Sequence, residues 1–595
     1  MRPITLIFFY LFSFIQITEA QVKPIFKNGL AQIVPEFEDA SKWIKEDLWV
    51  ETEFDTDGDG IMDRMHVAVI RQEQTETEGL KLPVIYNTSP YFAGVAQDSP
   101  GIFWDVNHEL GETPPPHKHP QVVRRGKRPI ISMRHSNTWV PRGYIMVYSS
   151  SPGTGLSDGS PTVGGSNETL APKAVIEWLS GKDNGFKDRT GQEKVTAYWS
   201  TGKVGMTGTS YNGTLPLAAA TTGVDALKVI IPVAPNTSYY HYYRSNGLVR
   251  SPGGYLGEDI DVLYDFIHSG DESNRAYGNR VYRDSIMARG IDRETGDYND
   301  FWASRDYLLQ MDNMKAAMLM SHGFNDWNVM PEHSNRIYQK AKQMGLTTQI
   351  YYHQFGHGGP PPVEMMNKWF SQFLHDQENG IENEPNKAHI VRAGDAPSQP
   401  TSYIDYPNPA AKSVRYYPTK ELSLSQKKTK GLKKYTLSDD VTIKGENLID
   451  LSNKDNRLLL LSPVLTNDVH ISGTAKINLS LSSSKSAANL SVWVVSLPWN
   501  ENEDALMTDN IITRGWADPQ NSESMDSGFP LMPGKSVDLS FDLQPDDQII
   551  KAGQQIGVMI FSSDQEFTLH PKPGTKLIID LNKTYIELPI VNNAF

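Results

Sequence analysis

A serine in a tight, glycine-flanked turn is the first residue of this chain that could do chemistry. Ser210 lies in the GMTGTSYNG stretch of residues 205–213, between a short apolar run and an alanine-rich stretch that predicts a helix start. A serine on a strand-to-helix turn presents its hydroxyl at the edge of a sheet, with the next backbone N–H available to an oxyanion. The G-x-S-x-G form is incomplete because Asn212 occupies its last position, so the turn alone also fits an ordinary glycine turn.

Two residues that could activate Ser210 follow it along the chain. Asp326 lies in an SHGFNDWN stretch and His357 in an HQFGHGG stretch, each directly after a short apolar run. The order serine, acid, histidine, with each residue on a loop after a strand, is that of the α/β-hydrolases. In that arrangement His357 would take the serine proton and return it to the leaving group, while Asp326 would orient the imidazole and stabilise its charge. The predicted chemistry is acyl transfer through a serine nucleophile.

Other interpretations of these loops stay open. His322 and His353 are rival bases, but each lies within or close to a predicted strand, which favours local packing or hydrogen bonding. Asp326 could also be a simple turn residue.

A second group of polar residues has the spacing of a metal loop. Its acidic members are Asp55, Asp57, Asp59 and Asp63, placed around two glycines much as in calcium loops. The terminal glutamate of an EF-hand is missing, since His66 stands at the twelfth position. A Gly/Asp hairpin turn explains the pattern equally well or better, and a calcium ion, if bound, would be structural.

The elements that must position these residues follow an α/β rhythm. From about residue 45 to 235, strand-like apolar runs alternate with glycine turns and helical stretches, which predicts a mostly parallel sheet. The predicted strands cover residues 82–86, 143–148, 204–206, 229–233, 317–320 and 349–352. Helices are predicted over residues 174–179, where Gly181 ends the segment, and around 365–374. A tyrosine cluster and charged helical stretches over about 236–312 predict an inserted helical cap.

After about residue 395 the chain changes character. Short runs that alternate with period two, such as residues 477–481, 490–495 and 556–560, predict an antiparallel, jelly-roll-like β-sandwich. The predicted fold class is therefore α/β with an all-β C-terminal domain. Its parts are a signal peptide over 1–20, an α/β-hydrolase domain over 21–395 and a sandwich domain over 396–595.

Composition excludes several classes of function. The 595 residues are 38% hydrophobic and 21% charged, as in a globular protein of two or three domains. A formal net charge of −14 argues against a nucleic-acid partner, because no basic field exists to neutralise phosphates. Cysteine is absent, which excludes disulfides and thiolate metal sites.

The first twenty residues have the pattern of a secretory signal peptide. Arg2 precedes an apolar run over residues 4–15, and Thr18-Glu19-Ala20 follows as a cleavage region. The apolar run is too short to span a bilayer comfortably, although a buried N-terminal helix or anchor is an alternative. We expect a bacterial protein that is secreted or periplasmic, with no stable membrane insertion.

Four stretches make the chain resemble the X-prolyl dipeptidyl aminopeptidases, within a wider group that includes cocaine esterase and the α-amino acid ester hydrolases. The stretches are residues 206–214, 242–254, 257–259 and 322–329, and the similarity runs from about residue 45 to the C-terminus. The nucleophile turn is common to the whole group. The Ser-Pro-Gly-Gly run at 251–254 and the following Gly257-Glu258-Asp259 are particular to the prolyl peptidases.

The resemblance implies roles for further residues. Tyr91, in the Asn-Thr-Ser-Pro-Tyr turn, would join the backbone N–H of Tyr211 in binding the oxyanion. Glu258 would bind the substrate ammonium group, assisted by Tyr242 and Asn328.

A proline pocket is implied as well. Its aromatic walls would come from the tyrosine cluster, and either Tyr239 or Tyr240 would line it.

The expected activity is that of a serine exopeptidase that releases Xaa-Pro dipeptides from free amino termini through an acyl-enzyme, with no required cofactor. An α-amino acid ester hydrolase or cocaine-esterase-like acyl hydrolase is the alternative, since it needs the same triad without a proline pocket. A non-catalytic carbohydrate-binding protein is a third reading, suggested by the predicted sandwich. The preferred first residue, the physiological peptide and the oligomeric state are open at this stage.

Overall fold

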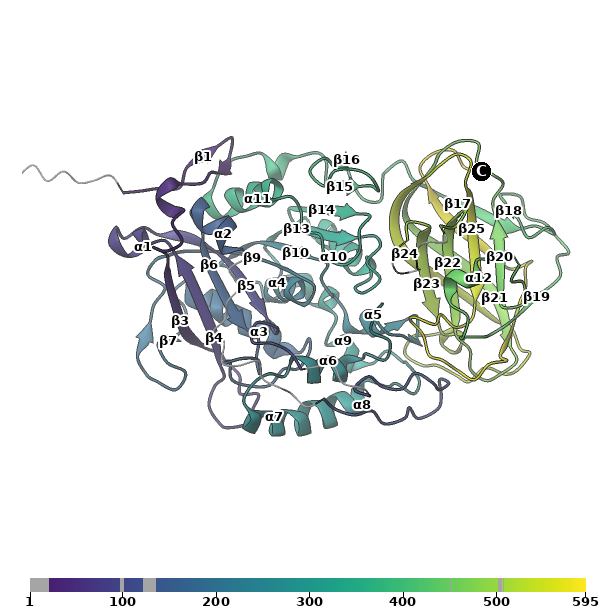
Figure 1. The fold of residues 1–595 in the computed structure, drawn as a ribbon, viewed down its shortest axis with the longest axis horizontal. Coiled ribbons are helices and arrows are strands. Elements are labelled where there is room, and N and C mark those ends of the chain that lie inside the picture. Colours follow the sequence, from purple (N-terminus) through teal and green to yellow (C-terminus); the bar gives the residue numbers. More distant parts are fainter. Residues whose placement is uncertain are drawn as a thin grey trace, which may run out of the picture.

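The chain folds into two lobes (Figure 1). The computed structural model describes residues 21–96, 101–120, 135–450, 452–500, 504, 506 and 508–595, so the predicted signal peptide lies outside the described residues. The purple-to-teal lobe holds a large sheet with helices, and the green-to-yellow lobe is built of strands. Within the described part of the chain, no helix is long and apolar enough to cross a bilayer.

The first lobe is built on a twelve-stranded sheet whose centre is parallel. In spatial order, the parallel strands are β15 (Ala388–Val391), β14 (Thr348–His353), β13 (Ala317–Gly323), β10 (Leu227–Val233), β9 (Ser200–Thr209), β5 (Leu82–Ser89) and β6 (Ile145–Ser150). Antiparallel strands form both edges: β16 (Thr401–Tyr403) on one side, and β4 (Arg64–Arg71), β3 (Ile44–Glu51), β7 (Gly185–Phe186) and β8 (Lys194–Val195) on the other. Each strand predicted from an apolar run is present.

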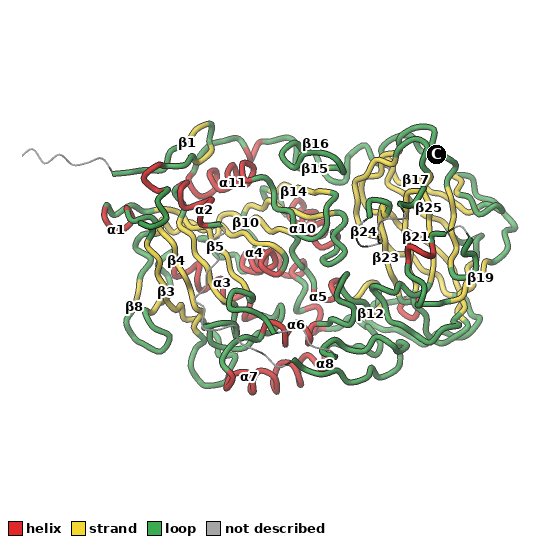
Figure 2. Tube along the Cα trace, viewed as in Figure 1, coloured by secondary structure: helices red, strands yellow, loops and turns green. Residues whose placement is uncertain are grey.

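Both faces of this sheet are buried, which is why its central strands are apolar along their whole length. Successive residues point to opposite faces, so Val84 packs in one core cluster and Ile85 in another. Residues of α3 (Ser166–Leu179), α4 (Tyr211–Thr221) and α10 (Glu332–Gln343) share the first cluster, and α2 (Ser136–Trp139) and α11 (Val363–His375) share the second. Figure 2 shows these helices beside the strands.

The carboxyl ends of neighbouring parallel strands lie at one edge of the sheet, where ligands bind in open α/β folds. Strand β9 ends at Thr209, immediately before the predicted nucleophile, and β5 ends at Ser89. Strands β13 and β14 end at Gly323 and His353, a few residues before the predicted acid and base. The order β14-β13-β10-β9-β5 thus brings all four loops to one side of the molecule.

A helical insertion separates β10 from β13, as the sequence predicts. Its segments are α5 (Tyr239–Tyr243), strands β11 (Arg244–Ser245) and β12 (Leu248–Val249), α6 (Ile260–Ile267), α7 (Glu272–Gly278), a π-helical segment η3 (Asn279–Met287), α8 (Ala288–Gly290), α9 (Asp300–Ala303) and a 3-10 segment η4 (Tyr307–Asn313). In Figure 1 helices α6, α7 and α8 of this cap lie along the lower side of the first lobe.

The second lobe consists of two antiparallel sheets with an apolar core between them. One sheet orders β18 (Leu424–Ser425), β17 (Lys412–Pro418), β27 (Tyr585–Ile590), β21 (Val469–Ser483), β26 (Lys576–Ile579) and β19 (Tyr435–Ser438), with β24 (Val537–Ile550) also paired to β21. The other orders β20 (Arg457–Leu461), β25 (Gln555–Phe561), β22 (Leu490–Leu497) and β23 (Ile511–Ala517). The first lobe's sheet reaches β16, a few residues beyond the predicted boundary at 395.

A third apolar cluster joins the lobes. It combines Leu248 of the cap and Trp327 of the β13 loop with Trp493 and Trp516 of the sandwich. The sandwich therefore packs directly against loops that surround the predicted site.

Candidate active site

Ser210 occupies a strained turn between β9 and α4. Its backbone has φ 63° and ψ −128°, outside the regions that ordinary residues favour, and its N–H donates to Val233 O at 2.9 Å. An ideal Cβ on Gly208 would lie 2.2 Å from Asn212 O, and one on Gly213 would lie 2.6 Å from Val233 O. Gly213 stands one position after the place of the last glycine in the G-x-S-x-G form. No larger residue fits there, because the backbone lies so close to β10.

Asp326 and His357 are hydrogen-bonded partners. His357 Nδ1 lies 2.7 Å from Asp326 Oδ2, and Asp326 Oδ1 accepts the backbone N–H groups of Asn328 and Val329 at 3.1 and 2.9 Å. The Asp326 side chain is fully buried. Burial alone would raise the pKa of its carboxyl, but the charges and hydrogen bonds of His357 and His322 lower that pKa to about 2. Asp326 is therefore an anion throughout the neutral range.

The His357 imidazole has one ring nitrogen held by the Asp326 carboxylate. Burial alone would lower the pKa of His357, but the charge and hydrogen bond of Asp326 raise it above its ordinary value. Nδ1 faces Asp326, and the side chain is 32% exposed. An ideal Cβ on Gly358 would lie 3.8 Å from Thr209 Cγ2, so this loop lies beside the nucleophile turn. No hydrogen bond joins Ser210 Oγ to His357 among the described residues; such contacts often tighten only when substrate binds.

The two rival histidines are engaged locally. His322 lies between Ser334 Oγ, 2.6 Å from Nδ1, and Val329 O, 2.8 Å from Nε2, and its Nε2 is 3.3 Å from Asp326 Oδ2. His353 Nε2 lies 3.0 Å from Gly358 O. His322 thus approaches the same carboxylate oxygen as His357, and His353 fixes the turn that carries His357.

Tyr91 and Tyr211 lie next to each other at the nucleophile turn. Their rings meet edge to face with centroids 5.9 Å apart. Tyr211 is the first residue of α4, where backbone N–H groups have no acceptor within the helix. Burial is the main cause that raises the pKa of the Tyr91 phenol, so this hydroxyl stays protonated and able to donate.

Glu168, which the sequence did not single out, supports this arrangement. Its buried carboxylate accepts Tyr211 OH at 2.6 Å and the backbone N–H groups of Val163 and Gly164 at 2.9 and 3.1 Å. Arg305 binds the carbonyls of Thr162 and Val163 in the same turn. The sequence offered one sign of Glu168: an acid in the first turn of a helix that follows two glycines. Many surface helices have such an acid, so the pattern did not single it out.

Glu258 lies close to both Tyr91 and Tyr242. Glu258 is 8% exposed, and its carboxylate accepts Tyr243 OH at 2.8 Å. After burial, the charge of Glu258 is the next cause that raises the pKa of Tyr91 and of Tyr242. Tyr242 OH donates to Asn328 Oδ1 at 3.2 Å, and Asn328 follows Asp326 by two residues. The structure thus places Tyr242 and Asn328 in contact with each other, and it adds Tyr243, whose hydroxyl binds the Glu258 carboxylate.

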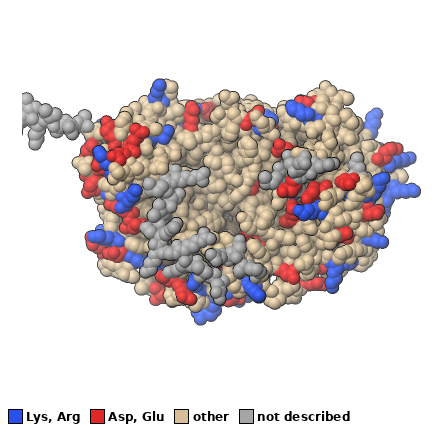
Figure 3. Space-filling model, viewed as in Figure 1, with Lys and Arg blue, Asp and Glu red and all other residues tan. Residues whose placement is uncertain are grey.

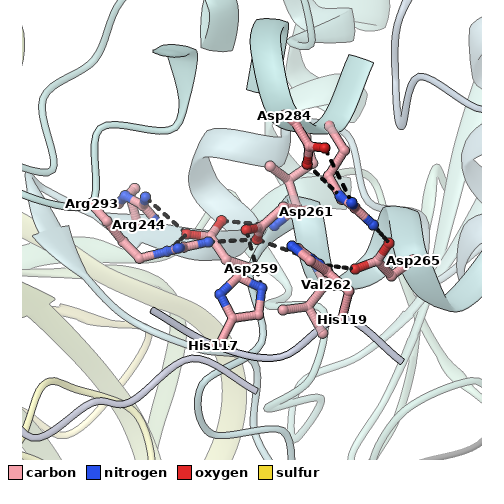
Figure 4. Close-up of polar contacts among 11 residues, drawn as sticks. His117, His119, Arg244, Asp259, Asp261, Val262, Asp265, Asp284 and Arg293 are labelled. Atoms are coloured by element: carbon pink, nitrogen blue, oxygen red, sulfur yellow. Dashed lines mark hydrogen bonds and ion pairs between the residues drawn. The ribbon is translucent and has the colours of Figure 1, made fainter. Parts of the chain in front are cut away.

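A buried ionic network fixes the segment that carries Glu258 (Figure 4). Asp259 caps α6 by accepting Ile260 N at 2.8 Å, and its Oδ2 lies 3.1 Å from Arg244 Nη2 and 3.0 Å from Arg293 Nε. Arg293 also binds Asp261. Gly257 has φ 86°, and an ideal Cβ there would lie 2.5 Å from Trp104 O. In the Gly-Glu-Asp run, Gly257 thus provides a left-handed turn, Glu258 is the implied amine-binding acid, and Asp259 caps α6.

The same helix holds down the loop of residues 113–120. His117 Nε2 lies 3.5 Å from Asp261 Oδ2, and His119 Nδ1 lies 2.5 Å from Asp265 Oδ2 (Figure 4). Arg283 binds Asp265 from the opposite side at 2.6 Å. Loop and cap are therefore linked by contacts between these two histidines and two carboxylates of α6.

The two adjacent tyrosines of α5 point into different surroundings. The Tyr239 ring packs edge to face on Tyr211, with centroids 6.1 Å apart. Tyr240 donates to Gly296 O at 3.2 Å and packs on Tyr298 and Trp302 inside the cap. Of the two candidates, Tyr239 is the one that contacts the nucleophile side.

The aspartate loop lies between β3 and β4. One carboxylate oxygen each of Asp55, Asp57 and Asp63 lies within 4.8 Å of the others. Asp59 is not a member of this group, and its Oδ1 accepts Ile61 N at 2.7 Å. Three of the four predicted metal-ligating residues thus converge.

Known proteins match the chain along its length. The family model for X-Pro dipeptidyl-peptidase (S15 family) matches residues 57–359, and that for the X-Pro dipeptidyl-peptidase C-terminal non-catalytic domain matches residues 379–593. A Rhodopirellula baltica protein named "Putative Xaa-Pro dipeptidyl-peptidase" is 58% identical over 100% of this chain and 95% of its own length. The Xaa-Pro dipeptidyl-peptidase of Ligilactobacillus salivarius is 32% identical over 96% of this chain and 79% of its own length.

Solved structures share the fold at low identity. An α-amino acid ester hydrolase aligns with a TM-score of 0.65 and 16% identity over 93% of this chain and 97% of its own. A CocE/NonD family hydrolase from Staphylococcus aureus aligns with a TM-score of 0.65 and 17% identity over 92% of this chain and 94% of its own. The predicted fold, an α/β-hydrolase domain followed by an antiparallel all-β domain, is confirmed.

Proposed function

This chain belongs to the X-Pro dipeptidyl-peptidase family S15, and on that premise we propose that it releases Xaa-Pro dipeptides from free amino termini with Ser210 as nucleophile. The observation that carries the proposal is the 2.7 Å contact between Asp326 and His357 on loops beside the strained Ser210 turn. A serine hydrolase needs this set of groups at one edge of its sheet.

The reaction proceeds in two acyl transfers. Ser210 Oγ attacks the carbonyl carbon of the proline residue while its proton passes to His357 Nε2. The carbonyl oxygen becomes an oxyanion, which the backbone N–H of Tyr211 and the hydroxyl of Tyr91 stabilise. His357 then protonates the leaving amine, the C–N bond breaks, and a dipeptidyl ester on Ser210 remains. Water, deprotonated by His357, attacks this ester and releases the dipeptide with restoration of the Ser210 hydroxyl.

Length selection is assigned to Glu258. A substrate ammonium in a closed site needs a carboxylate partner, and Glu258 is buried beside Tyr91 and Tyr242. Holding the amino terminus there would fix the length of the fragment that is released. Tyr239, which packs on Tyr211, is proposed as an aromatic wall for the proline ring.

The proposed steps use only groups of this chain, so no cofactor is required for them. Lysine and arginine side chains of the described residues are interspersed with acids on the face drawn in Figure 3, which fits a peptide rather than a nucleic-acid partner. The sandwich, for which a jelly-roll-like arrangement stays a prediction, is assigned a role in holding the site loops.

Export is a separate part of the proposal. A signal peptide over residues 1–20 would send the mature chain to the periplasm or the medium. Sequencing the amino terminus of the secreted protein should give Gln21 as the first residue.

An activated serine is tested by a fluorophosphonate probe and intact mass. The full chain should gain one adduct, and Ser210→Ala should gain none at equal exposure. A chain that stays unlabelled while folded would favour the carbohydrate-binding reading. Kinetics on Xaa-Pro, Xaa-Ala and simple ester substrates then separate the peptidase from an α-amino acid ester hydrolase, which would not require proline.

A further inference from the structure

The loop between β3 and β4 brings acidic side chains into a buried position that the peptidase reaction does not use. Asp63 is 1% exposed and Asp57 is 8% exposed, and Asp55 lies beside them. Among the described residues, no lysine or arginine forms an ion pair with any of the three carboxylates. Buried carboxylates without a cation are costly, because desolvation is not offset by a countercharge.

Each buried carboxylate has one satisfied and one unsatisfied oxygen. Asp63 Oδ2 accepts the N–H and hydroxyl of Thr56, and Asp57 Oδ2 accepts Gly159 N at 3.0 Å and Asn274 Nδ2 at 2.7 Å. Asp63 Oδ1 and Asp57 Oδ1 are buried and have no hydrogen-bond partner in the described part of the chain. The bonded oxygens hold both carboxylates in place, so the second oxygens are left as preorganised ligands.

Surrounding groups confirm that the loop is tightly built. An ideal Cβ on Gly159 would lie 2.2 Å from Asp63 Oδ2, so only glycine permits this approach. Three carboxylates that bring oxygens within 4.8 Å of one another repel, and a bound cation would relieve this repulsion.

We propose that Asp55, Asp57 and Asp63 bind one calcium ion that fastens the β3–β4 loop to the cap. Calcium suits this set because it takes carboxylate oxygens in flexible geometry and completes its shell with carbonyls and water. The link to the cap is direct, since Asp57 also binds Asn274 of α7 and a Cβ on Gly58 would meet the Tyr277 ring at 2.5 Å. The ion would therefore stabilise the docking of the cap over the site.

Terbium luminescence tests the site directly, because Tyr277 lies against the loop and can sensitise a bound lanthanide. The full chain, excited at the tyrosine band, should give a saturable terbium signal that calcium displaces with a dissociation constant no weaker than about 10⁻³ M. The signal should be lost in Asp57→Asn and in Asp63→Asn. Asp59→Asn is the matched control: it makes the same change in the same loop outside the converging group, and it should keep the signal.

Thermal unfolding supplies a readout that separates binding from folding. Calcium should raise the Tm of the full chain relative to chelator by several degrees, since a ligand that binds only the folded state stabilises it. Asp57→Asn and Asp63→Asn should lose this calcium-dependent increment, whatever their Tm in chelator. No increment in the unsubstituted chain, an equal loss in Asp59→Asn, or equal displacement of terbium by magnesium would overturn the proposal.

Discussion

At the scale of single residues, the proposed His357–Asp326 pair predicts how activity should depend on pH. Only neutral His357 can accept the serine proton, and its pKa lies above the ordinary 6.5 because of Asp326. We expect kcat/KM to rise with pH through this elevated pKa. Asp326→Asn should move the midpoint of the rise to lower pH and reduce kcat by roughly 10⁴-fold. A full pH profile of both proteins checks this, and an unmoved midpoint would contradict it.

The Tyr91 hydroxyl provides a second residue-scale prediction. Tyr91→Phe removes one oxyanion donor and should lower kcat by about 100- to 1000-fold with little change in KM. Tyr435→Phe removes a hydroxyl of the same kind in the sandwich, where it bonds Lys454 O, and should leave kcat intact. Steady-state kinetics with a chromogenic Xaa-Pro substrate compare them. Similar kcat values for Tyr91→Phe and the parent would remove Tyr91 from the mechanism.

Sequence reasoning reached some of these residues and missed others for a physical reason. Ser210, Asp326 and His357 sit directly after strands, so chain order and strand ends were enough to select them. Glu168 and Tyr243 act through contacts that join distant segments, as in the 43-residue separation between Glu168 and Tyr211. The Glu168 contact depends on how α3 packs beside α4, and the Tyr243–Glu258 contact depends on how α5 lies beside the turn before α6. No local pattern encodes either arrangement.

At the scale of elements, the start of α6 positions Glu258 through the bonds of Arg293 to Asp259 and Asp261. Arg293→Met should leave these buried acids short of a partner and loosen the amine site. We expect KM for a dipeptide substrate to rise about tenfold, the equivalent of roughly 1.4 kcal/mol, while the rate of fluorophosphonate labelling at Ser210 is unchanged. A fall in labelling rate instead would mean that Arg293 acts on the nucleophile.

Arg289→Met is the control for this experiment. Arg289 is exposed and binds Ser285 on the same part of the cap, so its loss should leave both KM and labelling unchanged.

Element boundaries show where local patterns are sufficient. Strands β5, β10 and β14 are buried on both faces and were predicted within a few residues. Strand β9 begins at Ser200, four residues before the apolar Val204, because Ser200 already pairs with Leu82 of β5. Sheet pairing, which depends on the neighbour, extends strands beyond their apolar runs.

At the scale of the whole molecule, the sandwich supports the acid loop. The Arg514 guanidinium of β23 lies 4.1 Å from the ring centroid of Trp327 and 4.6 Å from that of Trp493. Gln354, in the loop before His357, donates to Asp546 Oδ1 of β24 at 3.0 Å. The non-catalytic lobe thus contacts both loops that carry the predicted acid and base.

Replacing Arg514 tests this support. The positive charge of buried Arg514 stabilises the negative charge of buried Asp564. Arg514→Leu removes this charge and should lower the free energy of unfolding by about 3 kcal/mol and lower kcat. Arg415→Leu removes an exposed arginine from strand β17 of the sandwich and serves as control. Thermal unfolding and kinetics on both variants give the comparison. A stable, fully active Arg514→Leu would show that the lobes do not depend on this contact.

The account depends most on a buried carboxylate that recognises a free amino terminus next to an activated serine. The most direct test compares kcat/KM for Ala-Pro-nitroanilide with that for its N-acetylated form. We predict that acetylation lowers kcat/KM by at least roughly 100-fold, because it removes the charge that pairs with Glu258. Glu258→Gln should reduce this difference. Equal hydrolysis of both substrates by the unsubstituted chain would contradict the account.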